Sequence, residues 1–218
     1  MSDKIYMIPG LGFDRRIFKK LKLKISQINY IEYIEPLKNE PLQDYVSHLI
    51  DLNIERSRSI ILIGYSFGGI IAQEIAKQIE VEKIILISSI KSRDENPFHF
   101  KIIGSLGLHH FFNKKWTVKT FPWWATFHGY ADTDSQQLFE KMISQHSDNY
   151  LQWALFELSN WRGVQLLNTP IIHIHGEKDK TFPMSLVSKS TKVKGGTHVM
   201  VYNKAEEVSR LINNALES

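Results

Sequence analysis

Gly64-Tyr65-Ser66-Phe67-Gly68-Gly69 lies between an apolar run at 59–63 and a segment of helical character at 70–79. This order predicts a buried strand, a tight turn and a helix. The G-x-S-x-G pattern inside it is typical of a serine held on a sharp strand-to-helix turn. Such a turn needs small residues two positions before and after the serine, and Gly64 and Gly68 meet that need.

The predicted turn has a chemical consequence for Ser66. It would lift the Ser66 hydroxyl above the edge of a sheet, and the N–H of Phe67 would point into the same space, where it could hold a developing oxyanion. We therefore interpret Ser66 as a candidate nucleophile. The alternative is a glycine-rich turn that carries an ordinary serine, because a five-residue pattern also arises by chance.

The composition indicates a globular chain. It has 218 residues, of which 43% are apolar, and this suits one α/β domain with an inserted segment. The absence of cysteine excludes disulfides, thiolate metal sites and a cysteine nucleophile. The N-terminus lacks the features of a signal peptide, and no apolar run is long enough to span a membrane. We expect a soluble, cytoplasmic protein.

The charge of the chain is moderately basic, with a formal net charge of +4 and a pI near 9.1. Its densest basic stretch, 15–24, fits either a patch for nucleic acid or anionic lipid, or the solvated face of a surface helix. We favour the solvated face, with Ile17, Phe18, Leu21 and Leu23 turned inward. No nucleic-acid-binding module accompanies the stretch, so we expect no nucleic-acid partner. The sequence does not indicate an oligomeric state.

Apolar runs that predict strands recur at 4–8, 29–34, 60–63, 83–88, 170–176 and 190–194. Apolar residues at helical spacing predict helices at 41–56, 70–79, 136–144 and 150–158. Further helices are expected to begin at Arg15, capped by Asp14, and near Asn203, where Glu206 would complete a capping box. Strands that alternate with helices in this way predict an α/β fold with a mostly parallel sheet of about six strands, flanked by helices.

A candidate base and a candidate acid follow the last two predicted strands. A serine hydroxyl needs a base within hydrogen-bond reach, and the base needs an orienting carboxylate. His198 follows Gly195-Gly196-Thr197, and Asp179 follows His175-Gly176. Because ligands of parallel sheets bind at the carboxyl ends of the strands, the loops that carry Ser66, Asp179 and His198 are expected to meet there.

Each of these candidates has an alternative. Asp179 could be a solvated turn residue, and Asp94 is the second candidate for the acid. His173 and His175 alternate with isoleucines in a predicted strand, and we interpret them as core or edge residues. No spacing of carboxylates and histidines typical of a metal site occurs, so we expect neither a metal ion nor another cofactor.

The turn after the first strand, Pro9-Gly10-Leu11-Gly12, is a candidate for a second oxyanion donor. The backbone N–H of Leu11 would donate, and Gly10 and Gly12 would let the backbone approach a ligand. The alternative is a simple tight turn.

Together, four motifs resemble those of the α/β-hydrolase superfamily, and the resemblance covers nearly the whole chain. They are Pro9-Gly10-Leu11-Gly12, Gly64-Tyr65-Ser66-Phe67-Gly68-Gly69, His175-Gly176-Glu177-Lys178-Asp179 and Gly196-Thr197-His198. The resemblance implies an α/β-hydrolase fold and a Ser66–His198–Asp179 triad. It also implies an oxyanion hole from the backbone N–H groups of Phe67 and Leu11.

The resemblance further implies a single domain, 1–218, with a helical lid or cap inserted at 91–162. Two features depart from the usual family pattern. Pro9 stands where the family usually has histidine, and the sheet is a compact six-strand version, as in plant hydroxynitrile lyases and methyl esterases. In the lyases a lysine follows the catalytic histidine, whereas Val199 follows here, which argues against cyanohydrin cleavage.

The segment 91–162 is rich in aromatic residues. Trp116, Trp123, Trp124 and Phe127 are candidates for the lining of an apolar substrate pocket over Ser66; alternatively, they belong to a small core within the segment. We expect a serine hydrolase of the carboxylesterase type, acting on a small molecule with a small or medium apolar acyl group. The alternatives are a carbon–carbon bond hydrolase, a thioesterase or a perhydrolase with the same triad, or a non-catalytic ligand-binding protein.

Overall fold

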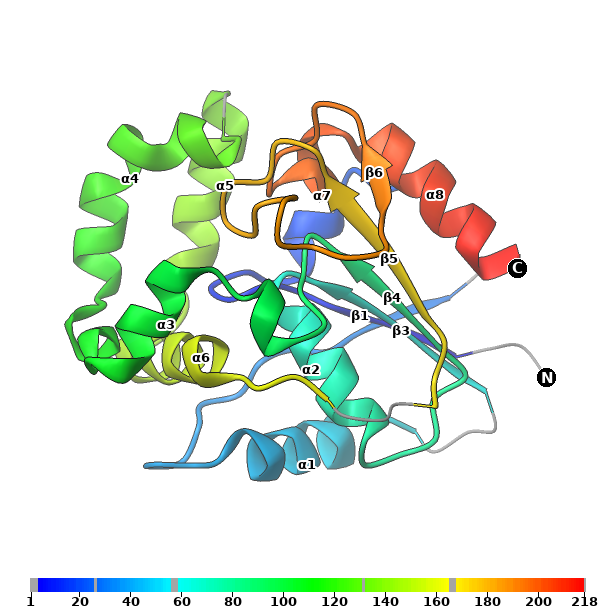
Figure 1. The fold of residues 1–218 in the computed structure, drawn as a ribbon, viewed down its shortest axis with the longest axis horizontal. Coiled ribbons are helices and arrows are strands. Elements are labelled where there is room, and N and C mark those ends of the chain that lie inside the picture. The colour runs from blue at the N-terminus through cyan, green and yellow to red at the C-terminus, as the bar shows by residue number, and fades with distance from the viewer. Residues whose placement is uncertain (1–3, 26, 56–58, 131, 165–167, 218) are drawn as a thin grey trace.

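The computed structural model describes residues 4–25, 27–55, 59–130, 132–164 and 168–217. Six strands form one sheet in the order β2-β1-β3-β4-β5-β6, and all neighbouring strands are parallel (Figure 1). The strands are β1 (Lys4–Ile8), β2 (Ile28–Tyr30), β3 (Ile60–Tyr65), β4 (Lys83–Ile87), β5 (Ile171–Gly176) and β6 (Thr191–Val193). The predicted parallel sheet of about six strands is thereby confirmed.

The register of the sheet brings the carboxyl ends of its strands to one edge. Ile8 lies opposite Gly64, Tyr65 opposite Ile87, and Gly176 opposite Val193. The turns that follow β1, β3 and β5 therefore leave the sheet at the same edge. The central strand β3 is buried along its whole length, as its unbroken apolar run predicts.

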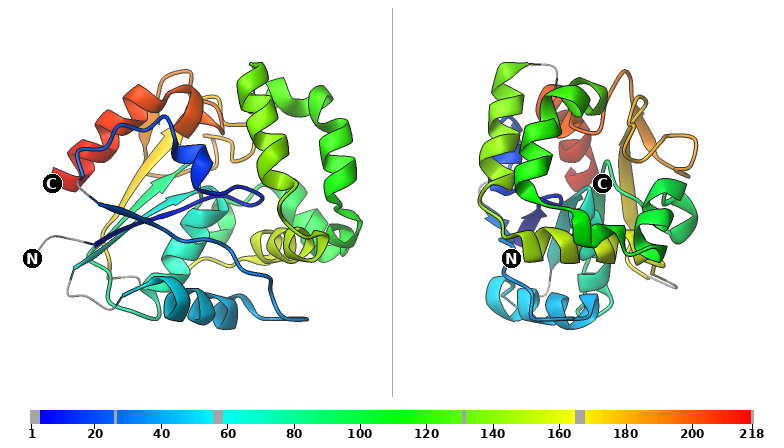
Figure 2. Two further views of the ribbon diagram at one scale, coloured as in Figure 1. Left: turned by 180° about the vertical axis from the view of Figure 1, so that it is seen from behind. Right: turned by 90° about the vertical axis from the view of Figure 1, so that its left-hand side faces the viewer.

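Helices cover both faces of the sheet. The helices α1 (Leu42–Asn53) and α2 (Phe67–Ala76) lie on one face, and α8 (Ala205–Glu217) lies on the other (Figures 1 and 2). The short helix α7 (Met200–Asn203) precedes α8, and η1 (Arg15–Phe18) is a 3-10 turn. None of the helices within the described residues combines the length and apolar character needed to cross a membrane.

Three local predictions differ from the structure. The segment that begins at Arg15, after its cap Asp14, is a single 3-10 turn rather than a longer helix. The strand predicted at 29–34 ends at Tyr30, because the Tyr45 hydroxyl bonds both the N–H and the carbonyl of Ile34 and draws the chain away from the sheet. Asn203 ends α7 instead of capping the last helix, so the predicted capping box is wrong.

The chain between β4 and β5 is helical. It contains η2 (Arg93–Glu95), α3 (Phe98–Ser105), η3 (Leu108–Phe111), α4 (Lys114–His128), α5 (Thr133–Ile143) and α6 (Asp148–Asn160). These helices lie beside the carboxyl edge of the sheet, at the left in Figure 1. An antiparallel bridge between Ser92 and Gly163 joins the two ends of the segment. The helices α5 and α6 occur where helical spacing predicts them, whereas α3 and α4 were not predicted.

Candidate active site

Ser66 occupies the turn between β3 and α2 in a strained backbone conformation. Its φ is 54° and its ψ is −122°, a region that residues with a side chain rarely adopt. The turn is held on both sides, because the Ser66 N–H donates to the carbonyl of Ile87 at 2.9 Å and the Ser66 carbonyl accepts from Ser89 Oγ at 2.7 Å. This fixed turn points the hydroxyl of Ser66 away from the strand.

The glycines of the turn are required by close backbone contacts. A Cβ atom on Gly64 would lie 2.4 Å from the carbonyl oxygen of Gly68, and one on Gly68 would lie 2.2 Å from that of Ile8. Neither contact can be relieved by rotating a side chain, because the neighbouring atoms belong to the backbone. The predicted need for small residues around Ser66 therefore has a direct physical cause.

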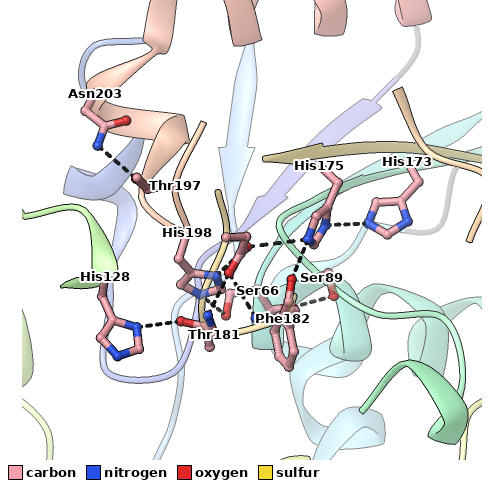
Figure 3. Close-up of polar contacts among 11 residues, drawn as sticks. Ser66, Ser89, His128, His173, His175, Thr181, Phe182, Thr197, His198 and Asn203 are labelled. Carbon is pink, nitrogen blue, oxygen red and sulfur yellow. Dashed lines mark hydrogen bonds and ion pairs between the residues drawn. The ribbon is translucent and has the colours of Figure 1, made fainter. Parts of the chain in front are cut away.

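Ser66, His198 and Asp179 form a hydrogen-bonded chain (Figure 3). Ser66 Oγ lies 3.0 Å from His198 Nε2, and His198 Nδ1 lies 2.9 Å from Asp179 Oδ2. The three residues are 5%, 6% and 3% exposed. Because an ionised carboxylate only accepts hydrogen bonds, Nδ1 of His198 carries the proton and Nε2 is free to accept from the Ser66 hydroxyl.

The loops of Asp179 and His198 are bonded directly to each other. The N–H of Lys178 donates to the carbonyl of Gly196 at 2.7 Å, and the N–H of Gly195 donates to the carboxylate of Glu177 at 2.9 Å. The other oxygen of Asp179, Oδ1, accepts from the backbone N–H groups of Thr181 and Phe182 at 2.8 and 2.9 Å. These bonds fix the direction in which the carboxylate faces His198.

Comparison with known proteins identifies the family. Residues 7–211 match the sequence profile of the alpha/beta hydrolase family. The chain belongs to this family. No curated protein matches the chain.

Several solved structures share the fold of this α/β hydrolase at low sequence identity. An esterase from Exiguobacterium antarcticum has a TM-score of 0.74 and 16% identity, covering 100% of this chain and 92% of its own. A hydrolase from Oleispira antarctica has a TM-score of 0.76 and 12% identity, with the same coverage of 100% and 92%. An epoxide hydrolase from Bacillus megaterium has a TM-score of 0.67 and 14% identity, covering 100% and 94%.

The turn after β1 of this hydrolase lies against the serine. A Cβ atom on Gly10 would lie 3.1 Å from the Cβ atom of Ser66. Phe67 is the first residue of α2, so its N–H precedes the hydrogen bonds of the helix. Within the described residues, no acceptor bonds the backbone N–H of Leu11 or Phe67. Both candidate donors therefore remain available beside Ser66.

The end of α4 contacts both loops of the candidate triad. His128 Nδ1 lies 2.9 Å from Thr181 Oγ1 in the Asp179 loop. Asn203 donates through its side chain to the carbonyl of Gly129 at 2.9 Å. The same side chain donates to Thr197 Oγ1 at 3.1 Å (Figure 3). Burial and the nearby His198 lower the pKa of His128 to about 4, so its imidazole is neutral near pH 7. The sequence indicated Asn203 only as a helix cap, and no local pattern indicated that His128 or Asn203 contacts these loops.

Two buried histidines extend the network behind Asp179 (Figure 3). His175 Nε2 lies 2.8 Å from the carbonyl of Phe182 and 3.6 Å from Asp179 Oδ2, and its Nδ1 lies 3.2 Å from His173 Nε2. Since a carbonyl only accepts, His175 carries its proton on Nε2 and accepts from His173 at Nδ1. Both residues are core residues, as their alternation with isoleucines indicated, but their link to Asp179 was not predicted.

We expect His173 to lower the stability of the protein in acid. Burial lowers the pKa of His173 from its ordinary value of 6.5 to about 3. Because the folded-state pKa is depressed, stability that is present above about pH 6.5 is lost as the pH falls toward 3, while the unfolded chain takes up the proton first. Between pH 7 and pH 5 this group should lower the free energy of unfolding by about 2 kcal/mol.

Urea unfolding of the wild type and of His173→Leu at pH 7 and pH 5 measures this effect. The free energy of unfolding of the variant, relative to the wild type, should rise by about 2 kcal/mol between pH 7 and pH 5. His110→Leu is the control, because it also replaces an imidazole by leucine but at an exposed position. A difference between wild type and His173→Leu that does not change with pH would contradict a buried, neutral His173.

The aromatic residues proposed for the pocket lie in two environments. Trp124 packs edge-on against Phe121 and Phe139, in a small core between α4 and α5. In contrast, Trp116, Trp123 and Phe127 are 62%, 86% and 62% exposed, so these three side chains face solvent.

A different aromatic pair stands beside the candidate triad. The Phe182 ring centroid lies 5.6 Å from that of His198 and 5.8 Å from that of Phe100.

Asp94, the second candidate for the acid, is exposed in η2. Within the described ranges, no group of three or more histidine, aspartate or glutamate side chains could hold a metal ion.

Proposed function

We propose that this α/β hydrolase is a serine hydrolase that cleaves uncharged carboxylic esters. The observation that carries the proposal is the chain of hydrogen bonds from Ser66 Oγ to His198 Nε2 at 3.0 Å and from His198 Nδ1 to Asp179 Oδ2 at 2.9 Å. In this order the base reaches the nucleophile and the carboxylate orients the base, as nucleophilic catalysis by serine requires.

The proposed reaction proceeds through an acyl-enzyme. Ser66 Oγ attacks the ester carbonyl carbon while His198 Nε2 takes up the hydroxyl proton, and Asp179 stabilises the resulting imidazolium. The oxyanion accepts hydrogen bonds from the backbone N–H groups of Phe67 and Leu11. The tetrahedral intermediate expels the alcohol, which receives the proton from His198. Water, deprotonated by His198, then attacks the acyl carbon. The second tetrahedral intermediate expels Ser66 Oγ, which receives the proton from His198, and the carboxylic acid is released.

The preference for an uncharged, apolar acyl group follows from the surroundings of the candidate triad. The fully buried ring of Phe182 packs against both His198 and Phe100, so the imidazole has an apolar neighbour. His128, on the helical segment that we propose as the lid (91–162), is neutral near pH 7 because its pKa is lowered to about 4. Apolar walls with a few polar groups favour apolar ligands over charged ones.

A fluorophosphonate probe and a substrate panel test the proposal. The probe should label Ser66 in the folded protein, with the modified peptide identified by mass spectrometry, and heat-unfolded protein should not react. The panel contains aryl esters of graded acyl length and the matching thioesters, and it separates an esterase from a thioesterase that has the same triad. Folded protein that fails to react with the probe would favour a ligand-binding role instead.

We expect Asp179→Asn to lower kcat by about 10⁴ without unfolding the protein. The backbone N–H groups of Thr181 and Phe182 would hold the amide oxygen of asparagine, so its amide nitrogen would face His198 Nδ1. That nitrogen cannot accept a hydrogen bond, so the imidazole would turn to the tautomer that carries its proton on Nε2. That tautomer cannot accept the proton of Ser66.

Glu177→Gln is the matched control for Asp179→Asn. Glu177 lies in the same loop and accepts a hydrogen bond from the Gly195 N–H, which glutamine can also accept. Its kcat should stay close to the wild-type value. Equal losses in the two variants would assign the effect to the loop rather than to the carboxylate of Asp179.

A further inference from the structure

The outer face of α4 exposes three large aromatic side chains. Trp116, Trp123 and Phe127 are 62%, 86% and 62% exposed. Their spacings of seven and four residues place them within about 40° of one another around the helix axis. In Figure 1 the helix forms the outer edge of the segment between β4 and β5, and the right-hand view of Figure 2 faces it. Large exposed apolar side chains gathered on one side of a helix in this way mark an interaction surface.

Positive charge accompanies the stripe. Lys115 and Lys119 are exposed on the same side of the helix, and Lys119 Nζ lies 5.2 Å from the ring centroid of Trp116. At the other end, Lys180 Nζ lies 5.9 Å from the ring centroid of Phe127. Among the described residues, none of these three lysines forms an ion pair.

The stretch of chain that carries Lys115 and Lys119 has no acidic residue of its own. The sequence contains neither aspartate nor glutamate between Glu95 and Asp132. Lys114, Lys115 and Lys119 also line one surface hollow of about 370 Å³, together with Val118 and Ser144. The face therefore combines apolar side chains that lack a partner with cations that suit an anionic one.

We propose that the α4 face, defined by Lys115, Trp116, Lys119, Trp123 and Phe127, docks on an anionic lipid surface. Tryptophan and phenylalanine rings insert at the boundary between headgroups and acyl chains, and lysine side chains reach the anionic headgroups. A second copy of the chain fits less well. In a symmetric dimer the same face would meet itself, and its uncompensated lysines would repel one another.

The docked orientation would bring the candidate active site to the lipid surface. The last residue of α4, His128, lies 2.9 Å from Thr181 in the Asp179 loop, and Asn203 ties Gly129 to the His198 loop. An ester dissolved in the lipid would meet the protein beside Ser66. The docking itself does not depend on the proposed function, because it involves none of the candidate triad.

Co-sedimentation with large unilamellar vesicles tests the docking. The protein carries Ser66→Ala, so that no lipid is turned over, and the vesicles contain phosphatidylcholine alone or phosphatidylcholine with phosphatidylglycerol. We expect binding to the anionic vesicles that weakens as salt is added, and much weaker binding to phosphatidylcholine alone. Two double variants, Trp123→Ser with Phe127→Ser and Lys115→Gln with Lys119→Gln, should each weaken binding by about tenfold or more.

Matched controls remove the same kinds of side chain elsewhere. Leu52→Ser removes an exposed apolar residue from α1, and Lys192→Gln with Lys194→Gln removes two exposed lysines from β6 and the turn after it. Both controls should bind like the parent protein. All variants change exposed positions, and thermal unfolding checks that each one is folded.

Three results would overturn the proposal. The first is a parent protein that does not bind the anionic vesicles, and the second is binding that the α4 variants and the controls reduce equally. The third is a dimer in solution, seen by light scattering, that the α4 variants dissociate, because this would assign the face to contact between copies of the chain.

Discussion

Ser66→Ala should lower kcat for an activated aryl ester by roughly 10⁵–10⁶, as the loss of a triad nucleophile does in serine hydrolases. The alanine methyl group cannot attack a carbonyl, and water would have to reach the same position without the orientation that the strained turn provides. His198 Nε2, now 3.0 Å from a hydroxyl oxygen, would lose its partner. The residual rate should come from the oxyanion donors and from substrate binding.

Steady-state kinetics on the best substrate of the ester panel measures this loss, with the protein prepared free of host esterases. The fold should be unaffected, because Ser66 contributes its side chain to a single hydrogen bond and alanine fits the same space. The melting temperature of Ser66→Ala should therefore stay close to that of the wild type. A variant that keeps a tenth or more of the wild-type kcat would rule out Ser66 as the nucleophile.

Gly68→Ala should destabilise the protein by about 3 kcal/mol or more. Its new Cβ atom would lie 2.2 Å from the carbonyl oxygen of Ile8 and 2.4 Å from that of Pro9. Both oxygens belong to the backbone, so α2 would have to move away from the end of β1. Alanine is the better helix former, by about 1 kcal/mol, so the measured destabilisation would be smaller than the cost of the steric clash by about that amount.

Urea unfolding of three glycine variants gives a graded test. Gly195→Ala meets no atom within 4 Å, but its φ of +65° should cost about 1 kcal/mol. A Cβ atom on Gly69 would lie 2.3 Å from Ser89 Oγ and 2.6 Å from Ser89 Cβ. Rotation of the Ser89 side chain can move Oγ, at the loss of its bond to the Ser66 carbonyl, but it does not move Cβ, so part of the clash would remain. We expect the loss of stability to increase from Gly195 to Gly69 to Gly68. If Gly68→Ala were as stable as Gly195→Ala, this result would contradict the close contact between α2 and the end of β1.

The displacement of α2 should also affect catalysis. The N–H of Phe67, a proposed oxyanion donor, begins this helix, and Gly68 sets its distance from the turn after β1. Gly68→Ala protein that remains folded should therefore show a lower kcat than Gly195→Ala protein. If a folded Gly68→Ala variant had the wild-type kcat, the rate of the reaction would not depend on the position of α2.

The central strands and the turn at Ser66 could be predicted because their signals are local. An unbroken apolar run marks a strand buried on both faces, and the glycines mark a turn that admits no side chain. The length of the helical segment that begins at Arg15 and the end of the second strand could not be predicted in this way. The second strand ends because the Tyr45 hydroxyl, eleven residues away, takes both backbone groups of Ile34.

The helix α4 escaped prediction for a related reason. Its apolar residues are distributed around the helix instead of along one side, and Pro122 lies inside it. One side packs Phe121 and Trp124 against α5, while the other exposes Trp116, Trp123 and Phe127. Helical spacing identifies a helix that has one buried side, so a helix with apolar residues on two sides does not stand out.

The sequence alone determines that Ser66, Asp179 and His198 each follow a predicted strand, in this order. Strand runs and glycine turns depend on neighbouring residues, and parallel strands bring their carboxyl ends together whatever the lengths of the connections. The supporting contacts are different. His128 and Thr181 are 53 residues apart, Asn203 and Gly129 are 74 apart, and His175 approaches Asp179 through the fold of the loop. The contacts of His128 and Asn203 join the helical segment to the loops of Asp179 and His198, and no spacing along the chain encodes them.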